Sequence, residues 1–126
     1  MINETKIVVE QIKDYPDIRL YRNFLFEGEA DYLINKFGKR LYKSGGIGDN
    51  GTTIYTGTRT SSSGSIKRCE DEVVYRIQER ISKILNTTIT KMENLQILNY
   101  KYGQEFQFHF DWFFDNHLPY EIAGQR

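Results

Sequence analysis

The chain has 126 residues, of which 39% are hydrophobic, so it is long enough for one modest hydrophobic core and one domain at most. Its 17 basic and 17 acidic residues give a formal net charge of zero, which argues against nucleic acid or an anionic membrane as a partner. No apolar run approaches the roughly 20 residues that span a bilayer, and the first residues lack the apolar stretch of a signal peptide. We therefore expect a cytoplasmic protein.

The first third of the chain predicts two strands and a helix. Residues 7–9 and 18–21 are rich in β-branched and aromatic residues, and the turn-forming residues 14–17 separate them. Apolar residues then recur at the spacing of one helix face, and Gly38 could end that helix. The stripe consists of Ala30, Leu33, Ile34 and Phe37. We expect this helix to cover a sheet.

The middle of the chain predicts loops and a second helix. Residues 44–65 are rich in Gly and Ser, which favours loops around one short β-prone piece at 52–56. The acidic residues 70–72 and the late Lys83 suit the two ends of a helix dipole. Its predicted buried stripe is Val73, Ile77, Ile81 and Ile84, and its predicted solvated face carries Arg76, Glu79 and Arg80.

Two further strands are predicted at 93–100 and 105–113, joined as a hairpin by a turn that contains Gly103. The aromatic content of 14% also favours a β-rich core. Alternation on the second strand would place Phe106, Phe108, Phe110 and Trp112 on one face. The opposite face would then carry Gln107, His109, Asp111 and Phe113.

This opposite face is a candidate metal site. His109 and Asp111 would lie about 6.6 Å apart along the backbone, from a rise of roughly 3.3 Å per residue, and both side chains could lean onto one ion. An imidazole with a carboxylate suits a borderline divalent metal, and two histidines with one carboxylate form the open triad of non-haem iron oxygenases. A His-x-Asp triplet also arises by chance on a solvated strand, so it carries little weight alone.

Several segments support the triplet by their order along the chain. They are Arg59-Thr60-Ser61-Ser62, the helix at 71–81, the strand at 93–100, Gly103-Gln104, His109-Phe110-Asp111-Trp112-Phe113 and Gly124-Gln125-Arg126. With them, most of the chain resembles the prolyl 4-hydroxylase family of iron(II)- and 2-oxoglutarate-dependent dioxygenases. The ordered set is far more specific than any one motif.

The resemblance implies an α+β fold, namely the N-terminal part of a double-stranded β-helix, or jelly-roll, with two flanking helices. It implies His109 and Asp111 as iron ligands and Tyr100 as a ligand of the 2-oxoglutarate carboxylate, with ascorbate as a further cofactor. Arg59 and Ser61 match a segment near the peptide-binding loops. The alternative for Tyr100 is a buried strand tyrosine, and the alternative for Arg59 and Ser61 is a solvated loop.

The chain departs from the family pattern in two ways. The pattern continues past Arg126 with a distal iron-binding histidine and a lysine that pairs with 2-oxoglutarate, so we expect residues 1–126 to be a single incomplete domain. The other histidine, His117, lies beyond the predicted strand and is a poor ligand candidate. Phe106 stands where relatives often carry tyrosine.

Three functional hypotheses follow. The first is a dioxygenase that hydroxylates prolyl or related residues of peptides or proteins, inactive as this chain alone unless a partner chain supplies the missing half. The second is a non-catalytic interaction fragment that binds a partner through an exposed sheet edge. The third is a zinc-dependent hydrolase, because zinc accepts the same ligands.

Overall fold

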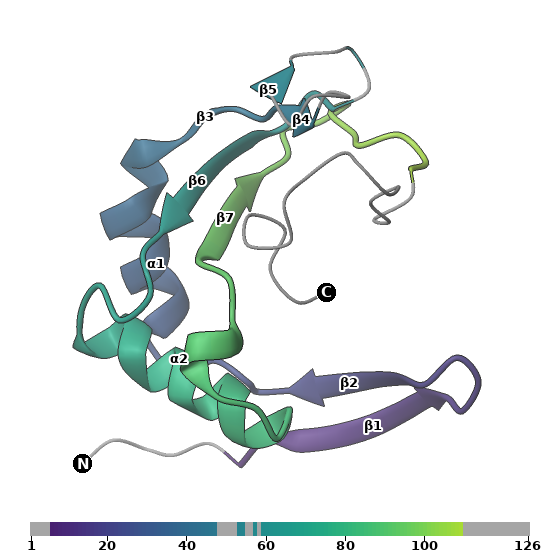
Figure 1. The fold of residues 1–126 in the computed structure, drawn as a ribbon, viewed down its shortest axis with the longest axis vertical. Coiled ribbons are helices and arrows are strands. Elements are labelled where there is room, and N and C mark those ends of the chain that lie inside the picture. Colours follow the sequence, from purple (N-terminus) through teal and green to yellow (C-terminus); the bar gives the residue numbers. More distant parts are fainter. Residues whose placement is uncertain (1–5, 48–52, 55–56, 58, 110–126) are drawn as a thin grey trace. The chain divides into compact units, whose positions relative to one another are not determined.

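The computed structural model describes residues 6–47, 53–54, 57 and 59–109 (Figure 1). It divides the chain into two compact units, Met1–Lys36 and Phe37–Arg126. Both helices and strands are present, which confirms the mixed class of the fold; the single incomplete domain stays a prediction. No helix in the described ranges is long and apolar enough to cross a membrane.

The first unit contains the two predicted strands as an antiparallel ribbon. Strand β1 spans Val8–Lys13 and β2 spans Ile18–Arg22, with Val8 opposite Arg22 and a register shift between Gln11 and Lys13. Cross-strand charge pairing supports this register, because the Nε of Arg22 lies 2.9 Å from a carboxylate oxygen of Glu10.

Helix α1 spans Glu29–Phe37, as the apolar spacing predicts. The side chain of its first residue, Glu29, accepts a hydrogen bond of 2.8 Å from the N–H of Phe26, which lies three residues before the helix. Gly38 ends the α-helix, but the chain continues as the 3-10 helix η1, Gly38–Arg40. Within the predicted stripe, Phe37 is wholly buried, whereas Ile34, at the margin of the stripe, is 59% exposed.

The second unit is built on a three-stranded antiparallel sheet in the order β3-β6-β7 (Figure 1). Its strands are Tyr42–Lys43, Ser62–Ile66 and Leu95–Asn99, and a separate pair is formed by β4, Gly46–Ile47, and β5, Thr53–Ile54. The β-prone piece predicted at 52–56 contains β5, but the prediction of loops elsewhere in 44–65 is wrong at β4 and in its last part, where the serine-rich β6 is the central strand. Composition failed here because backbone pairing on both sides, not side-chain propensity, holds this strand.

Helix α2 spans Glu72–Ile84, and the Asp71 side chain caps it by accepting the Val74 N–H at 2.8 Å. The predicted stripe is rotated: Ile77 is buried, but Val74 and Gln78 are the other buried positions, while Val73 is half-buried. Glu79 and Arg80 are likewise half-buried rather than solvated. The buried apolar residues of this unit are Phe37, Ile66, Val74 and Ile77.

The predicted hairpin between 93–100 and 105–113 is wrong within the described residues. β7 pairs with β6, with Asn99 opposite Ser62, and Phe106 then forms an antiparallel bridge with Arg59, which precedes β6. The two segments predicted to pair with each other therefore both pair with a third segment, residues 59–66. From the Ser62–Asn99 pair to the Arg59–Phe106 bridge, the chain before β6 covers three residues, whereas the chain after β7 covers seven. The four extra residues after β7 form the turn at 101–104, where Gly103 has a φ of 78°. Residues 110–113 lie outside the described part.

Candidate metal centre

His109 is the one predicted metal ligand in the described part of the chain, and its ring has a defined orientation. Its Nδ1 donates a hydrogen bond of 2.6 Å to the carbonyl oxygen of Gln107. Because a carbonyl oxygen only accepts, this bond places the proton of the neutral ring on Nδ1 and the lone pair on Nε2. Backbone carbonyls fix metal-binding histidines in this way, so the tautomer suits a ligand that binds through Nε2.

The His109 ring also stacks on Phe106. Their centroids lie 3.6 Å apart with 13° between the ring planes. Strand alternation predicted these two residues on opposite faces. That prediction is wrong, because among the described residues 105–109 only Phe106 forms a β-bridge and the chain bends at Phe108. A stacked pair of this kind contributes about 1 kcal/mol beyond its buried area.

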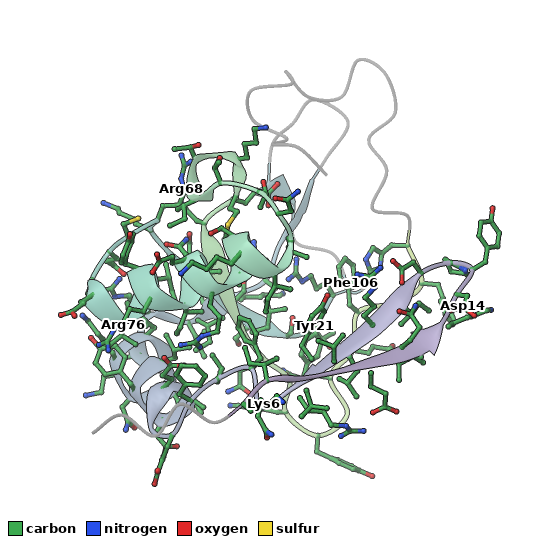
Figure 2. The ribbon with its side chains drawn as sticks, turned by 90° about the horizontal axis from the view of Figure 1, so that it is seen from below. Lys6, Asp14, Tyr21, Arg68, Arg76 and Phe106 are labelled. Atoms are coloured by element: carbon green, nitrogen blue, oxygen red, sulfur yellow. The ribbon has the colours of Figure 1, made fainter. Side chains whose placement is uncertain are left out.

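Arg59 contacts the same phenyl ring. Its guanidinium carbon lies 4.8 Å from the Phe106 centroid, and one terminal nitrogen donates to the Gly45 carbonyl at 3.3 Å. Figure 2 labels Phe106 in this unit. The guanidinium therefore has two separate contacts, one to a backbone carbonyl and one to an aromatic face.

Backbone and side-chain bonds hold the segments of Arg59 and Phe106 together. The Thr60 N–H donates to the Glu105 carbonyl at 2.9 Å, and the Glu105 N–H donates to the Thr60 hydroxyl at 2.9 Å. The same hydroxyl lies 3.2 Å from the Glu105 carbonyl. This local network fixes the contact between residues 59 and 106 across the sheet.

The other predicted metal-binding residues lie outside the described ranges. Asp111 and His117 both fall there, so the pairing of His109 with Asp111 stays a prediction. Among the described residues, no group of three or more His, Cys, Asp or Glu side chains is placed to hold a metal ion.

Tyr100 directly follows β7 on the open face of the sheet. The paired residues Tyr42, Ser63 and Leu98 share this face, and Tyr100 lies two residues beyond Leu98. Tyr42, Leu98 and Tyr100 are 57%, 45% and 44% exposed. Tyr100 is thus not the buried strand tyrosine of the alternative interpretation, and its ring is accessible to a ligand.

Ser61 and Arg59 both differ from residues of a solvated loop. Ser61 is wholly buried, and its hydroxyl donates to the Ser44 hydroxyl at 3.0 Å, while its carbonyl accepts the Ser44 N–H at 3.0 Å. Arg59 is half-buried. The substrate contacts predicted for them stay predictions. For Ser61, the hydroxyl is turned into the protein.

Sequence reasoning missed the contact of Arg59 with Phe106. The two residues are far apart in the chain, and the predicted hairpin paired Phe106 with the wrong neighbour. The spacing of three between Phe106 and His109 was visible, but on a regular strand that spacing separates two rings instead of stacking them.

Comparisons with known proteins confirm the predicted resemblance. The chain is 34% identical over 116 residues to prolyl 4-hydroxylase 2 of Arabidopsis thaliana, covering 91% of this chain and 38% of that protein. It is 35% identical over 119 residues to prolyl 4-hydroxylase 5 of the same plant, covering 94% and 40%. Probable prolyl 4-hydroxylase 4 is 32% identical over 116 residues, covering 90% and 38%. No protein-family model matches the chain.

These relatives are much longer than the region that they share with this chain. The chain spans about two-fifths of the length of the curated relatives that it matches. The similarity nevertheless extends over about nine-tenths of the chain itself, so it is not confined to the neighbourhood of one motif.

Proposed function

We propose that this chain is part of an iron(II)- and 2-oxoglutarate-dependent dioxygenase that hydroxylates prolyl or related residues of peptides or proteins. The observation that carries the proposal is its similarity, over about nine-tenths of its length, to proteins named prolyl 4-hydroxylases. His109 and Asp111 stand as the His-x-Asp pair of that family's pattern.

Of the expected ligand pair, His109 lies among the described residues and Asp111 does not. Iron(II) would be held by His109 through Nε2 and by Asp111, because the hydrogen bond from Nδ1 to Gln107 leaves the lone pair on Nε2. When bound, the metal would supply coupled chemistry in which 2-oxoglutarate and O₂ give succinate and CO₂, with one oxygen atom of O₂ entering succinate and the other inserted into a C–H bond of the substrate. The protein's part is to orient the ligands and to bind the co-substrate.

The remaining roles extend the same proposal. Tyr100 would bind a carboxylate of 2-oxoglutarate, a role that its accessible ring supports. Arg59 and Ser61 would lie near the peptide, and ascorbate would keep the metal reduced. The exposed Tyr42 and Leu98 support a jelly-roll, since a second sheet packed on that open face would complete a sandwich.

A third metal ligand and a cation for 2-oxoglutarate would come from a further segment or from a partner chain. Two protein ligands hold iron weakly, and without a cation the co-substrate dicarboxylate is poorly neutralised. We therefore propose that residues 1–126 alone bind the metal but do not turn over.

Metal titration of the 126-residue chain tests the proposal. We expect Co²⁺, used as a stand-in for iron(II), to bind and to bind at least tenfold more weakly in His109→Ala and Asp111→Ala. Lys83→Ala, a change on the surface of α2, is the control. If the Co²⁺ affinity is the same in the unaltered chain and in all three variants, the His-x-Asp pair is not a metal site, and the proposal is wrong.

The second candidate is a non-catalytic interaction fragment. Its specific support is the open sheet face, where Leu98 and Tyr42 are about half exposed. A proline-containing peptide, 2-oxoglutarate and iron(II) should then give no oxygen-dependent succinate, even after a downstream segment is added. Succinate release that needs oxygen would instead exclude both this candidate and a zinc-dependent hydrolase.

A further inference from the structure

Arg59 and His109 are joined through one aromatic ring. Phe106 stacks on the His109 imidazole at 3.6 Å, and the Arg59 guanidinium carbon lies 4.8 Å from the centroid of the same ring. The three side chains come from two segments that are 45 or more residues apart in the chain, as the Thr60 to Glu105 bonds show. Phe106 therefore contacts both Arg59 and the metal-ligand candidate.

The Arg59 side chain is held on its other side as well. One terminal nitrogen donates to the Gly45 carbonyl at 3.3 Å, and its Nε is buried without a hydrogen-bond partner in the described residues. A buried N–H without a hydrogen-bond acceptor is costly, and the contact of the guanidinium with the Phe106 face offsets part of that cost. This arrangement is unfavourable unless Phe106 stays beneath the guanidinium.

The orientation of the Phe106 ring depends in turn on its contact with Arg59. It is 36% exposed, so burial alone does not fix its ring, and the next aromatic residue, Phe108, is fully exposed. The backbone bridge to Arg59 sets the position of Phe106, and the guanidinium restricts the orientation of the ring. The plane of the His109 imidazole follows that ring to within 13°.

We propose that Arg59 is a positioning residue for His109, acting through Phe106. The guanidinium holds the phenyl ring, and the phenyl ring together with the Gln107 carbonyl fixes the plane and the tautomer of the imidazole. This inference rests on the proposed function only in taking His109 as a metal ligand. It gives Arg59 a role that is distinct from contact with a peptide.

The first test needs no metal. The chain holds only two histidines, so the imidazole protons of His109 are assigned by comparison with His117→Gln. At a fixed pH above the ordinary histidine pKa, the stacked phenyl ring should shift the His109 ring protons upfield. We expect Phe106→Leu to abolish this shift, Arg59→Met to reduce it, and Phe106→Tyr to retain it.

Arg68→Met is the matched control. Arg68 also donates to a backbone carbonyl, that of Thr90 at 2.6 Å, and Figure 2 shows it well separated from Phe106. The same loss of a guanidinium there should leave the His109 resonances unchanged. The amide spectrum of β6 and β7 shows whether each variant keeps its sheet, so a resonance change caused by unfolding is recognised.

The second test is Co²⁺ affinity of the same set of proteins. Groups that orient a metal-binding histidine typically contribute ten- to a hundredfold to affinity, and we expect about a tenfold loss in Arg59→Met and Phe106→Leu. Phe106→Tyr and Arg68→Met should bind as the unaltered chain does.

Two results would overturn the inference. One is a folded Arg59→Met protein whose His109 ring protons keep the same upfield shift as in the unaltered chain, which would leave Arg59 as a peptide contact at most. The other is an Arg59→Met protein in which the upfield shift of His109 is reduced but the Co²⁺ affinity is unchanged. If the unaltered chain binds no Co²⁺, the proposed function fails, and the resonance test still decides whether Arg59 positions His109.

Discussion

The orientation of His109 depends on two contacts that a motif does not contain. The His-x-Asp triplet predicts which side chains could bind a metal, because imidazole and carboxylate are its usual ligands. The tautomer depends instead on the Gln107 carbonyl, and the ring plane depends on Phe106. Both follow from the bend at Phe108, and local propensity gave no sign of that bend. Residue types were thus predictable here, and residue geometry was not.

A second residue-scale feature is the carboxylate of Asp17 in the β1-β2 turn. A hydrogen bond of 2.6 Å from the Gln11 side chain, with a further contribution from Arg19, lowers the pKa of Asp17. A lowered folded-state pKa contributes stability that is present above the ordinary value of about 3.9 and is lost as the pH falls through the lowered value. We expect Gln11→Ala to raise the pKa of Asp17 toward its ordinary value in an NMR titration of the carboxyl carbon. An unchanged titration curve would contradict this account.

Among the elements, β6 shows where pattern reasoning stops. Strands β1, β2 and β7 and both helices were predictable as elements from their residue types and end signals, although the buried stripe of α2 is rotated from the predicted one. The sequence Ser62-Ser63-Gly64-Ser65-Ile66 carries turn-forming residues, yet it lies between β3 and β7. Its small side chains are needed for close packing, since a Cβ at Gly64 would lie 3.3 Å from the Arg40 carbonyl oxygen. Only the neighbours of the strand reveal that need.

Gly64→Ala tests this packing argument. The added methyl would meet Arg40 backbone at 3.3 Å and the Ile97 side chain at 3.4 Å, and the central strand cannot easily move away. We expect the free energy of unfolding in urea to fall by about 1 kcal/mol, the lower end of overpacking costs, even after the stiffer unfolded chain is allowed for. Gly57→Ala is the control, because nothing lies within 4 Å of its added methyl. Equal stability of both variants would show that the contact relaxes freely.

At the scale of the whole molecule, the sheet of the second unit has two unlike faces. Gly64 and Ile66 are buried on one face, and Ile97 is opposite Gly64. Leu98 is on the other face and is 45% exposed. Composition predicted enough apolar residues for one core, but it could not tell which face of the sheet would expose apolar side chains among the described residues. Which face is open depends on the pairing of β6 with β7, and the predicted hairpin had placed β7 beside a different strand.

Neighbouring substitutions on β7 distinguish the two faces. Ile97 is half-buried beside Gly64 on the covered face, and we expect Ile97→Gln to cost about 1 kcal/mol of unfolding free energy, because it removes part of an apolar contact and brings a polar group there. Leu98→Gln on the open face should change that free energy by less than about 0.5 kcal/mol. It should also reduce self-association in sedimentation experiments, since it removes an exposed apolar side chain. If Leu98→Gln were more destabilising than Ile97→Gln, Leu98 would be buried in solution. The face on which we expect a second sheet to pack would then already be covered.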